Sequence, residues 1–325
     1  MYTKDRVLLA LQQTSGYLSG ESMSEQLGVS RAAIWKAINS LREQGYEIDS
    51  VTNKGYRLLS VPDVLTQESV RNVLADTHIA AVYVLESVDS TNNEAKRQAQ
   101  KGAPHNSVFV AEEQTGGKGR LGRVWKSPAG SGLWFTLLLR PLVPPEQVTC
   151  LTLLAGMAVS RAIRELSGLD AQIKWPNDVV LGGQKLCGIL TEMAAEVERI
   201  EYVGVGIGVN VNTESFPEEI AFKATSLLLA TGKRWNRAQL LKAILLEMET
   251  LLQRQENGEI EQILKEYQSE CVTIGRKVSV QRGNIRLSGI AEGITDTGEL
   301  LVRQSNGSIL TINSGEVSVQ GIYGE

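Results

Sequence analysis

The apolar positions of the first sixty residues follow two spacings, which predict helices and then a hairpin. Between 31 and 44 they recur every three or four residues, so we expect a helix with one buried face there. These residues are Ile34, Ala37, Ile38 and Leu41. Alternating positions replace this spacing at 46–52 and 56–59, on either side of the turn sequence 53–55, and predict two short paired strands.

Two shorter helical patterns precede the 31–44 helix. Residues 5–13 carry three apolar positions on one side and predict a first helix. A second helix is expected to open at Ser22, because Glu25 stands three residues later in capping-box spacing, and to end at Gly28. Ser30 is then placed to cap the third helix.

The exposed side of the third predicted helix is polar, with cations near its N-terminal end. Two short helices around Gly28 are typical of a helix-turn-helix, whose second helix enters the major groove of DNA. The predicted hairpin forms the wing that follows such a motif, and Lys54 and Arg57 give it positive charge. Turn, cap and wing together favour DNA binding over the alternative, a three-helix interaction domain with solvated charges. The candidate DNA contacts are Ser30, Arg31, Ala32, Trp35, Lys36, Lys54 and Arg57.

Beyond a linker at 60–63, where Pro62 disfavours helix at the preceding residue, strands and helices are mixed. The expected strands are 81–88, 108–113, 133–139 and 202–212, and the longer helices are 145–167, 237–255 and 259–269. From Arg276 onward only short strands follow, which indicates a small barrel. The expected fold class is multidomain α+β, with a winged helix-turn-helix at 1–62, a central mixed α/β sheet catalytic domain at 63–271 and a β-barrel at 272–325.

Composition limits the chemistry. The chain has 325 residues, of which 42% are hydrophobic and 22% charged, and its net charge is −4. No global basic field therefore indicates nucleic acid. Residues 1–60 hold seven Lys and Arg against six Asp and Glu, a net of +1, which leaves −5 for the rest. Three scattered cysteines and two histidines argue against a disulfide framework and a zinc site. Neither a secretory leader nor a membrane-spanning run is visible, so a cytoplasmic protein is expected.

The densest chemical signal is 114–125, where four glycines and three cations fall between Gly116 and Arg123. Backbone N–H groups and cations in such a loop can wrap an anion, and we expect the loop to be poorly ordered until an anion fills it. Its glycine spacing is not followed by a helix, which argues against a dinucleotide site. Gly119 directly after Lys118 excludes a Walker loop. A solvated basic loop is the alternative.

Residues 89–94 follow a predicted strand and open a helix. Thr91 and Glu94 have capping-box spacing, so the local pattern favours a cap at Thr91. The same geometry also aims Ser90, Thr91 and Asn92 at a pocket beside free N–H groups.

Polar residues also stand at the ends of later strands. Asn177 and Asp178 follow a strand and form turns readily, although Asp178 is also a candidate Mg²⁺ ligand. Lys185 begins an otherwise apolar strand, either as a solvated edge lysine or as a cation facing an anion. In 202–212 glycines alternate with Val and Ile up to Asn210, so a helix or a ligand must press on the bare face.

Taken in order, these stretches resemble the bifunctional biotin–protein ligases that also repress a biotin operon. The resemblance covers nearly the whole chain, and the order and spacing of the motifs carry it. The motifs are Asp89-Ser90-Thr91-Asn92, Gln114, Gly117-Lys118-Gly119-Arg120-Leu121-Gly122-Arg123 with Trp125, Lys174-Trp175-Pro176-Asn177-Asp178, Lys185-Leu186-Cys187-Gly188-Ile189-Leu190 and the glycine strand ending in Asn210. The family's loop is often richer in arginine, and Lys118 and Leu121 occupy two of those places.

The resemblance implies a central domain like that of class II aminoacyl-tRNA synthetases, an SH3-like barrel and a two-step reaction. Biotin and MgATP give biotinyl-5′-AMP and pyrophosphate, and a carrier lysine then attacks the mixed anhydride. The implied catalytic residues are Lys185, Arg120 and Lys118. The implied biotin-binding residues are Ser90, Thr91, Asn92, Gln114, Lys118, Gly119, Arg120 and Lys185. The implied ATP-binding residues are Arg120, Arg123, Trp125, Asn177, Asp178, Lys185 and Asn210, with Asp178 holding Mg²⁺.

The implied partners are the biotin carboxyl carrier protein of acetyl-CoA carboxylase, other biotin-dependent carboxylases and the operator DNA of biotin genes. A homodimer is expected when the intermediate is bound, with biotinyl-5′-AMP as corepressor. A biotin-sensing repressor that uses the same pocket only for binding, without ligase activity, is the alternative.

Overall fold

The computed structural model describes residues 3–43, 45–60, 63–141, 148–196, 199–282, 285–313 and 315–324. The predicted linker residue Pro62, the predicted helix start at 145 and the predicted helix end at 44 lie outside these ranges. The chain forms two compact units, Met1–Asp63 and Val64–Glu325. The finer division of the second unit at 271 stays a prediction.

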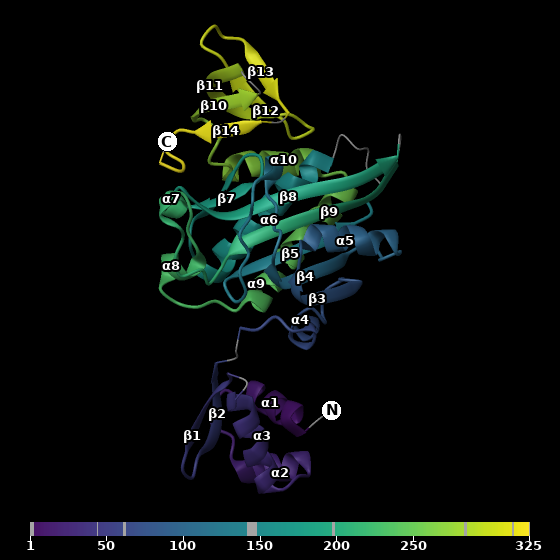
Figure 1. Ribbon diagram of the computed structural model, residues 1–325, viewed down its shortest axis with the longest axis vertical. Coiled ribbons are helices and arrows are strands. Elements are labelled where there is room, and N and C mark those ends of the chain that lie inside the picture. Colours follow the sequence, from purple (N-terminus) through teal and green to yellow (C-terminus); the bar gives the residue numbers. More distant parts are fainter. Residues whose placement is uncertain are drawn as a thin grey trace. The chain divides into compact units, whose positions relative to one another are not determined.

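The N-terminal unit contains the expected helices and hairpin (Figure 1, purple to dark blue). Its elements are α1 (Thr3–Gln12), α2 (Gly20–Leu27), α3 (Arg31–Glu43), β1 (Glu47–Val51) and β2 (Gly55–Ser60). The predicted cap of α2 at Ser22 is wrong: the hydroxyl of Ser19 accepts from the Ser22 backbone N–H, so the N-cap lies three residues earlier. Gly28 ends α2 in the left-handed conformation, as expected.

The second unit is built on a seven-stranded mixed sheet. Its strands are β3 (Ala81–Val88), β4 (Ser107–Gln114), β5 (Gly132–Leu139), β6 (Ala171–Lys174), β7 (Asp178–Leu181), β8 (Gln184–Glu196) and β9 (Arg199–Asn210). They lie in the order β3-β4-β5-β9-β8-β7-β6. The β3 and β4 strands are parallel, and the other neighbours are antiparallel.

Helices lie on both faces of this sheet (Figure 1). The described helices of the unit are α4 (Gln67–Val73), α5 (Thr91–Gln100), α6 (Val148–Ser167), α7 (Glu218–Ala221), α8 (Leu227–Thr231), α9 (Arg237–Glu256) and α10 (Ile260–Glu270). Along β4, Val108 and Val110 pack into the core that contains α6 and α9, whereas Phe109 packs with the alanines of α5. This alternation follows the strand period and puts α5 on the opposite face from α6 and α9. Among the helices of the described ranges, none combines the length and hydropathy that a membrane crossing requires.

The last strands form a separate antiparallel sheet within the same unit. They are β10 (Lys277–Arg282), β11 (Ile285–Ile294), β12 (Leu300–Arg303), β13 (Ile309–Ile312) and β14 (Glu316–Val319), in the order β13-β12-β11-β10-β14. Its apolar side shares one core with α6 and the central sheet. The indole N–H of Trp175 donates to the Gly298 carbonyl at 3.0 Å, which fastens the two sheets together. The likenesses to class II synthetases and to an SH3-like barrel stay predictions.

A buried ion pair anchors the segment that follows the basic loop. Arg237, fully buried at the start of α9, donates to both carboxylate oxygens of Glu112 at 2.9 and 3.2 Å and to the Gly132 carbonyl at 3.1 Å. Glu112 also accepts from the backbone N–H groups of Gly130 at 2.7 Å and Leu65 at 3.3 Å. This set of hydrogen bonds offsets the cost of burying the two charges.

Helices α6, α9 and α10 are joined by a second group of charges. Arg254 of α9 and Arg161 of α6 pair with Glu266 of α10 at 2.8 and 2.9 Å. The hydrogen bonds from Arg254 first, and then from Arg161, lower the pKa of Glu266 to about 2. A carboxyl whose pKa is depressed by folding stabilises the fold only while it is ionised.

We therefore expect Glu266→Gln to lower the free energy of unfolding by about 2 kcal/mol at pH 7. The difference from the wild type is fully present above the unfolded carboxyl pKa, and it is lost as the pH falls towards 2. Denaturant unfolding between pH 7 and pH 3 measures it. Glu261→Gln, an exposed position on the same helix, is the matched control and should change stability by less than about 0.5 kcal/mol. A difference between Glu266→Gln and wild type that does not shrink with falling pH would contradict this account.

Candidate functional site

Lys185 and Asp178 form an ion pair where β7 and β8 run side by side. The ammonium lies 2.7 Å from Asp178 Oδ1, at an angle outside good hydrogen-bond geometry. Asp178 is 8% exposed, whereas the Lys185 side chain keeps 29% of its surface. Burial alone would raise the pKa of Asp178, but the charges of Lys185 and Lys174 hold that pKa below its usual value. Asp178 therefore stays ionised, and the Lys185 side chain is the more accessible member of the pair.

The C-terminal segment reaches this pair from the second sheet. The Tyr323 hydroxyl donates to Asp178 Oδ2 at 2.6 Å, across 145 residues of chain. The ring of Tyr323 lies 4.9 Å from the Lys174 ammonium, which donates to the Val317 carbonyl at 2.9 Å. Sequence reasoning missed Tyr323, since no local pattern links it to a residue so far away.

The basic loop folds as a short hairpin over the ends of these strands. Gly119 N–H donates to the Arg123 carbonyl at 2.7 Å, and Trp125 N–H donates to the Gly117 carbonyl at 2.9 Å. Arg120 turns inward and donates to Asn177 Oδ1 at 3.1 Å. Lys118 and Arg123 are exposed.

One side chain and one backbone carbonyl hold the Arg120 guanidinium. Asn177 donates its amide N–H to the Ile189 carbonyl at 2.9 Å, which orients its oxygen towards Arg120. Arg120 also donates to the carbonyl of Gly315 at 3.3 Å. Of the three cations predicted in the loop, Arg120 is thus the one that the structure brings to Asn177 beside Asp178.

The bare glycine face predicted on β9 is covered by side chains. Trp125 lies against Gly188 and Gly208, which are paired across β8 and β9. A methyl group at Gly208 would come within 2.7 Å of the indole nitrogen, and one at Gly206 would come within 2.2 Å of Asn92 Oδ1. The glycines are therefore needed for close approach, as the sequence predicted, and Trp125 is one of the groups that approach. The Lys185 ammonium lies 5.2 Å from the Trp125 ring centroid.

A chain of hydrogen bonds joins α5, β4 and β5. Gln114 Oε1 accepts from both the backbone N–H and the hydroxyl of Thr91, at 2.8 and 3.1 Å. Thr136 Oγ1 lies 2.8 Å from Thr91 Oγ1 and 2.7 Å from Asn92 Oδ1. Gln114 also donates to Ser127 Oγ at 2.8 Å. Thr136 and Ser127 were missed, although a threonine inside the apolar run of β5 is a signal that could have found the first.

The predicted cap at Thr91 is wrong. The N-cap of α5 is Ser90, whose side chain makes no capping hydrogen bond, and Thr91 is the first helical residue. Ser90, Thr91 and Asn92 are all buried. Thr91 hydrogen-bonds to Gln114 and Asn92 to Thr136, and the role of the three residues at a pocket stays a prediction.

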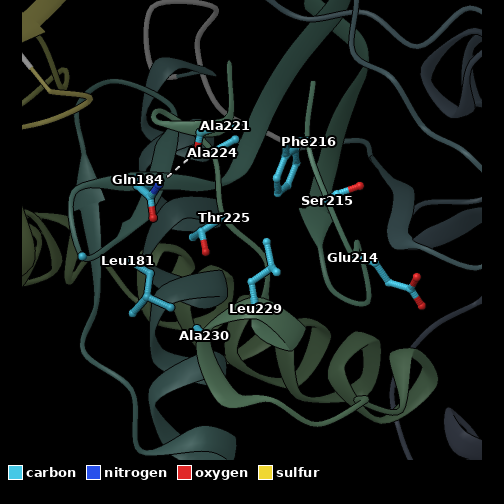
Figure 2. Close-up of a pocket in the computed structure, with 11 residues that line it drawn as sticks. Leu181, Gln184, Glu214, Ser215, Phe216, Ala221, Ala224, Thr225, Leu229 and Ala230 are labelled. Carbon is cyan, nitrogen blue, oxygen red and sulfur yellow. Dashed lines mark hydrogen bonds between the residues drawn. The ribbon is translucent and has the colours of Figure 1, made fainter. Parts of the chain in front are cut away.

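A surface pocket of about 550 Å³ adjoins the site between the β7–β8 turn and the chain after β9 (Figure 2). Its lining includes Leu181, Gln184 and Thr225, and none of the predicted site residues. Thr225 N–H donates to the Lys185 carbonyl at 2.9 Å, and Asn210 donates to the Thr225 carbonyl at 3.1 Å. Asn210 thus fixes the backbone at Thr225, which lies between this pocket and Lys185.

The predicted metal role rests on Asp178 alone. Within the described ranges, no three His, Cys, Asp or Glu side chains lie close enough together to hold an ion. Both oxygens of Asp178 already have partners, Lys185 and Tyr323. A dedicated metal cage does not fit these residues.

In the N-terminal unit, the predicted contact face of α3 is open. Arg31, Ala32, Trp35 and Lys36 are exposed, and Trp35 keeps 60% of its surface. Ser30 accepts from the Ala33 backbone N–H at 3.2 Å and thus caps the helix as expected.

The wing carries its two predicted cations at different exposures. Lys54 is exposed in the turn, whereas Arg57 is half-buried, with its guanidinium 4.8 Å from the Tyr17 ring centroid. Arg57 also lies 3.9 Å from Asp49. An aromatic face and a carboxylate thus orient Arg57 beside the wing.

Comparison with known proteins gives a match for each part of this arrangement. A helix-turn-helix domain model matches residues 3–57, the biotin/lipoate A/B protein ligase family model matches 84–210, and the biotin protein ligase C-terminal domain model matches 273–320. These matches define a ligase of the biotin/lipoate class that carries a DNA-binding domain.

Full-length relatives narrow this class. The bifunctional ligase/repressor BirA of Bacillus subtilis (strain 168) is 38% identical over 97% of this chain and 98% of its own. BirA of Escherichia coli (strain K12) is 30% identical over 96% of each chain. A structure of the biotin protein ligase from Aquifex aeolicus in complex with biotin and ATP is 33% identical, with a TM-score of 0.65, and covers 74% of this chain and 99% of its own. The chain belongs to the biotin protein ligase family, among its bifunctional ligase/repressors.

Proposed function

We propose that this protein joins biotin to the AMP moiety of ATP with release of pyrophosphate, transfers the biotinyl group to a carrier lysine, and represses biotin genes when the intermediate is bound. The position of Lys185, accessible beside Trp125 and backed by the buried Asp178, carries the proposal. The relatives named above support the ligase activity over a sensor without catalysis.

In the first step an oxygen of the biotin carboxylate attacks the α-phosphorus of ATP. The bond from that phosphorus to the bridging oxygen breaks, and pyrophosphate leaves. Both reactants are anions, so cations fixed at the new bond stabilise the transition state more than the ground state. Lys185 has three N–H donors, and Asp178 faces one side of its ammonium. The other donors are available to bridge the carboxylate and the α-phosphate.

The basic loop supplies the remaining cations. Arg120, oriented by Asn177, is proposed to contact the adenylate, and the exposed Lys118 and Arg123 to fold over its phosphate together with the backbone of Gly119. Closure of this loop would keep water from an anhydride that hydrolyses readily.

The hydrogen-bonded group around Gln114 is proposed to recognise biotin. Ser90, Thr91, Asn92 and Gln114 offer donors and acceptors for its ureido ring, while the glycines of β9 allow flat rings to lie close to the sheet. Trp125 borders both ligands in this proposal. Asn210 supports the ATP side through its bond to the pocket wall at Thr225.

In the second step the carrier lysine amine attacks the acyl carbon of biotinyl-5′-AMP, and AMP leaves. We propose the biotin carboxyl carrier protein of acetyl-CoA carboxylase as the carrier. No covalent enzyme intermediate is needed, and Cys150, Cys187 and Cys271 are buried. Burial raises the pKa of Cys187, which makes its thiol a poor nucleophile. Mg²⁺ would belong to the substrate MgATP, and Asp178, its predicted ligand, already faces Lys185 and Tyr323.

Repression is proposed to follow from the same intermediate. Ordering the basic loop around biotinyl-5′-AMP would complete a surface for a second copy of the chain. A two-fold dimer would present two α3 helices and two wings to a palindromic operator.

Lys185→Ala should slow biotin-dependent exchange of pyrophosphate into ATP by roughly 100-fold or more, because it removes a charge at the developing bond. Radiolabelled pyrophosphate exchange measures this. Lys101→Ala, at the exposed end of α5, is the control and should retain wild-type exchange. Near-normal exchange in Lys185→Ala would refute the proposed role.

Gly206→Ala should weaken biotin binding by at least roughly tenfold, because its methyl group would displace Asn92 from the face of β9. Gly204→Ala is the matched control on the same strand and face, where the nearest atom to a new methyl group is 3.5 Å away. Calorimetric titration with biotin compares the two. Equal affinities would show that this face takes no part in biotin recognition.

The double variant Arg31→Ala/Lys36→Ala should lose operator binding in mobility-shift assays yet keep ligation and adenylate-dependent dimerisation, since both side chains lie exposed in the N-terminal unit. Sedimentation of the variant with and without biotinyl-5′-AMP tests the second half. Equal dimerisation in both conditions would reject the adenylate as corepressor, and loss of ligation would reject the separation of the two units.

A further inference from the structure

Asp178 has two oxygens with different partners. Oδ1 faces Lys185 at 2.7 Å, and Oδ2 accepts from the Tyr323 hydroxyl at 2.6 Å. A carboxylate held at one oxygen can still rotate about its Cβ–Cγ bond, whereas one held at both cannot. The contact from Tyr323 is a charge-assisted hydrogen bond, which is shorter and stronger than a neutral one. It therefore fixes the orientation in which Oδ1 points at Lys185.

The position of the Tyr323 hydroxyl is set by two contacts that do not involve it. The backbone N–H of Tyr323 donates to the Gly183 carbonyl in the β7–β8 turn at 2.9 Å. Its ring lies 4.9 Å from the Lys174 ammonium. The neighbouring Ile322 is 3% exposed and belongs to the core. A phenylalanine at 323 would keep all of these contacts and lose only the hydroxyl.

We propose that Tyr323 is a positioning residue for adenylation: its hydroxyl orients the Asp178 carboxylate, which in turn fixes the Lys185 ammonium at the bond being formed. The proposal rests on the proposed function of Lys185. It gives the C-terminal sheet a direct part in the first chemical step, since the segment after β14 supplies the hydroxyl. A misplacement of a charge by about 1 Å is enough to cost a large factor in rate.

The test measures biotin-dependent pyrophosphate exchange in the full chain with four proteins: wild type, Tyr323→Phe, Asp178→Asn and the double variant. Tyr323→Phe should lower kcat about tenfold, as expected for a lost hydrogen bond to a charged group. The KM values for ATP and biotin should stay within twofold, because an interaction used only in the transition state affects kcat alone. The double variant should be no slower than Asp178→Asn, because Tyr323 acts through that carboxylate.

Tyr83→Phe is the matched control. Tyr83 stacks on Phe109 with ring centroids 4.6 Å apart, so it also loses only a hydroxyl at a packed ring, and it should keep wild-type kinetics. Wild-type kcat in Tyr323→Phe would overturn the proposal. So would a fall in kcat that adds fully to that of Asp178→Asn and comes with a lower Tm, because that pattern reports a purely structural contact. A wild-type chain without exchange would instead overturn the proposed function itself, and the role of Tyr323 with it.

Discussion

Asp178 is a carboxylate buried between strands. Burial disfavours its negative charge, and the surrounding residues stabilise that charge. Two ammonium groups and one hydroxyl face it, and each comes from a different part of the second unit. Lys185 stands on the neighbouring strand, Lys174 precedes the turn, and Tyr323 follows the last strand of the C-terminal sheet. Removing any one of them leaves a desolvated charge with fewer partners. The same requirement therefore ties the C-terminal sheet to the central one and keeps a cation exposed at the site.

Local chemistry was enough to predict most of the fold. Helical spacing in 31–44, the turn at 53–55 and the glycines of β9 each act over a few residues, so their sequence carries the signal. The two misplaced caps show the limit. At Ser22 and Thr91 the capping-box spacing is present, but Ser19, three residues earlier, and Ser90, one residue earlier, take the N-cap positions. Spacing alone does not distinguish which of several nearby hydroxyl residues stands at the N-cap, because tertiary contacts such as that between Thr91 and Gln114 contribute to the choice.

The motifs of the site could be predicted from the sequence, but the contacts between residues far apart in the chain could not. Lys185 and Arg120 stood out because a cation interrupts an apolar or glycine-rich stretch, and Asn177 because it follows the end of a strand. Tyr323 did not, because its partner lies 145 residues away and no periodicity spans that distance. The buried pair of Arg237 and Glu112 was likewise invisible, since each residue alone reads as an ordinary charged position. Contacts of this kind depend on how the sheet orders its strands, which a single sequence does not state.

The surroundings of Trp125 affect the fluorescence of its indole. Its indole lies against Gly188 and Gly208, 5.2 Å from the Lys185 ammonium and edge-on to Trp134, with ring centroids 6.4 Å apart. The excited state of an indole responds to a nearby charge and exchanges energy with an adjacent indole. A molecule that entered between Trp125 and the glycines would change both relations at once. The emission of Trp125 would then report occupancy without a label, against a background from the four other tryptophans of the chain.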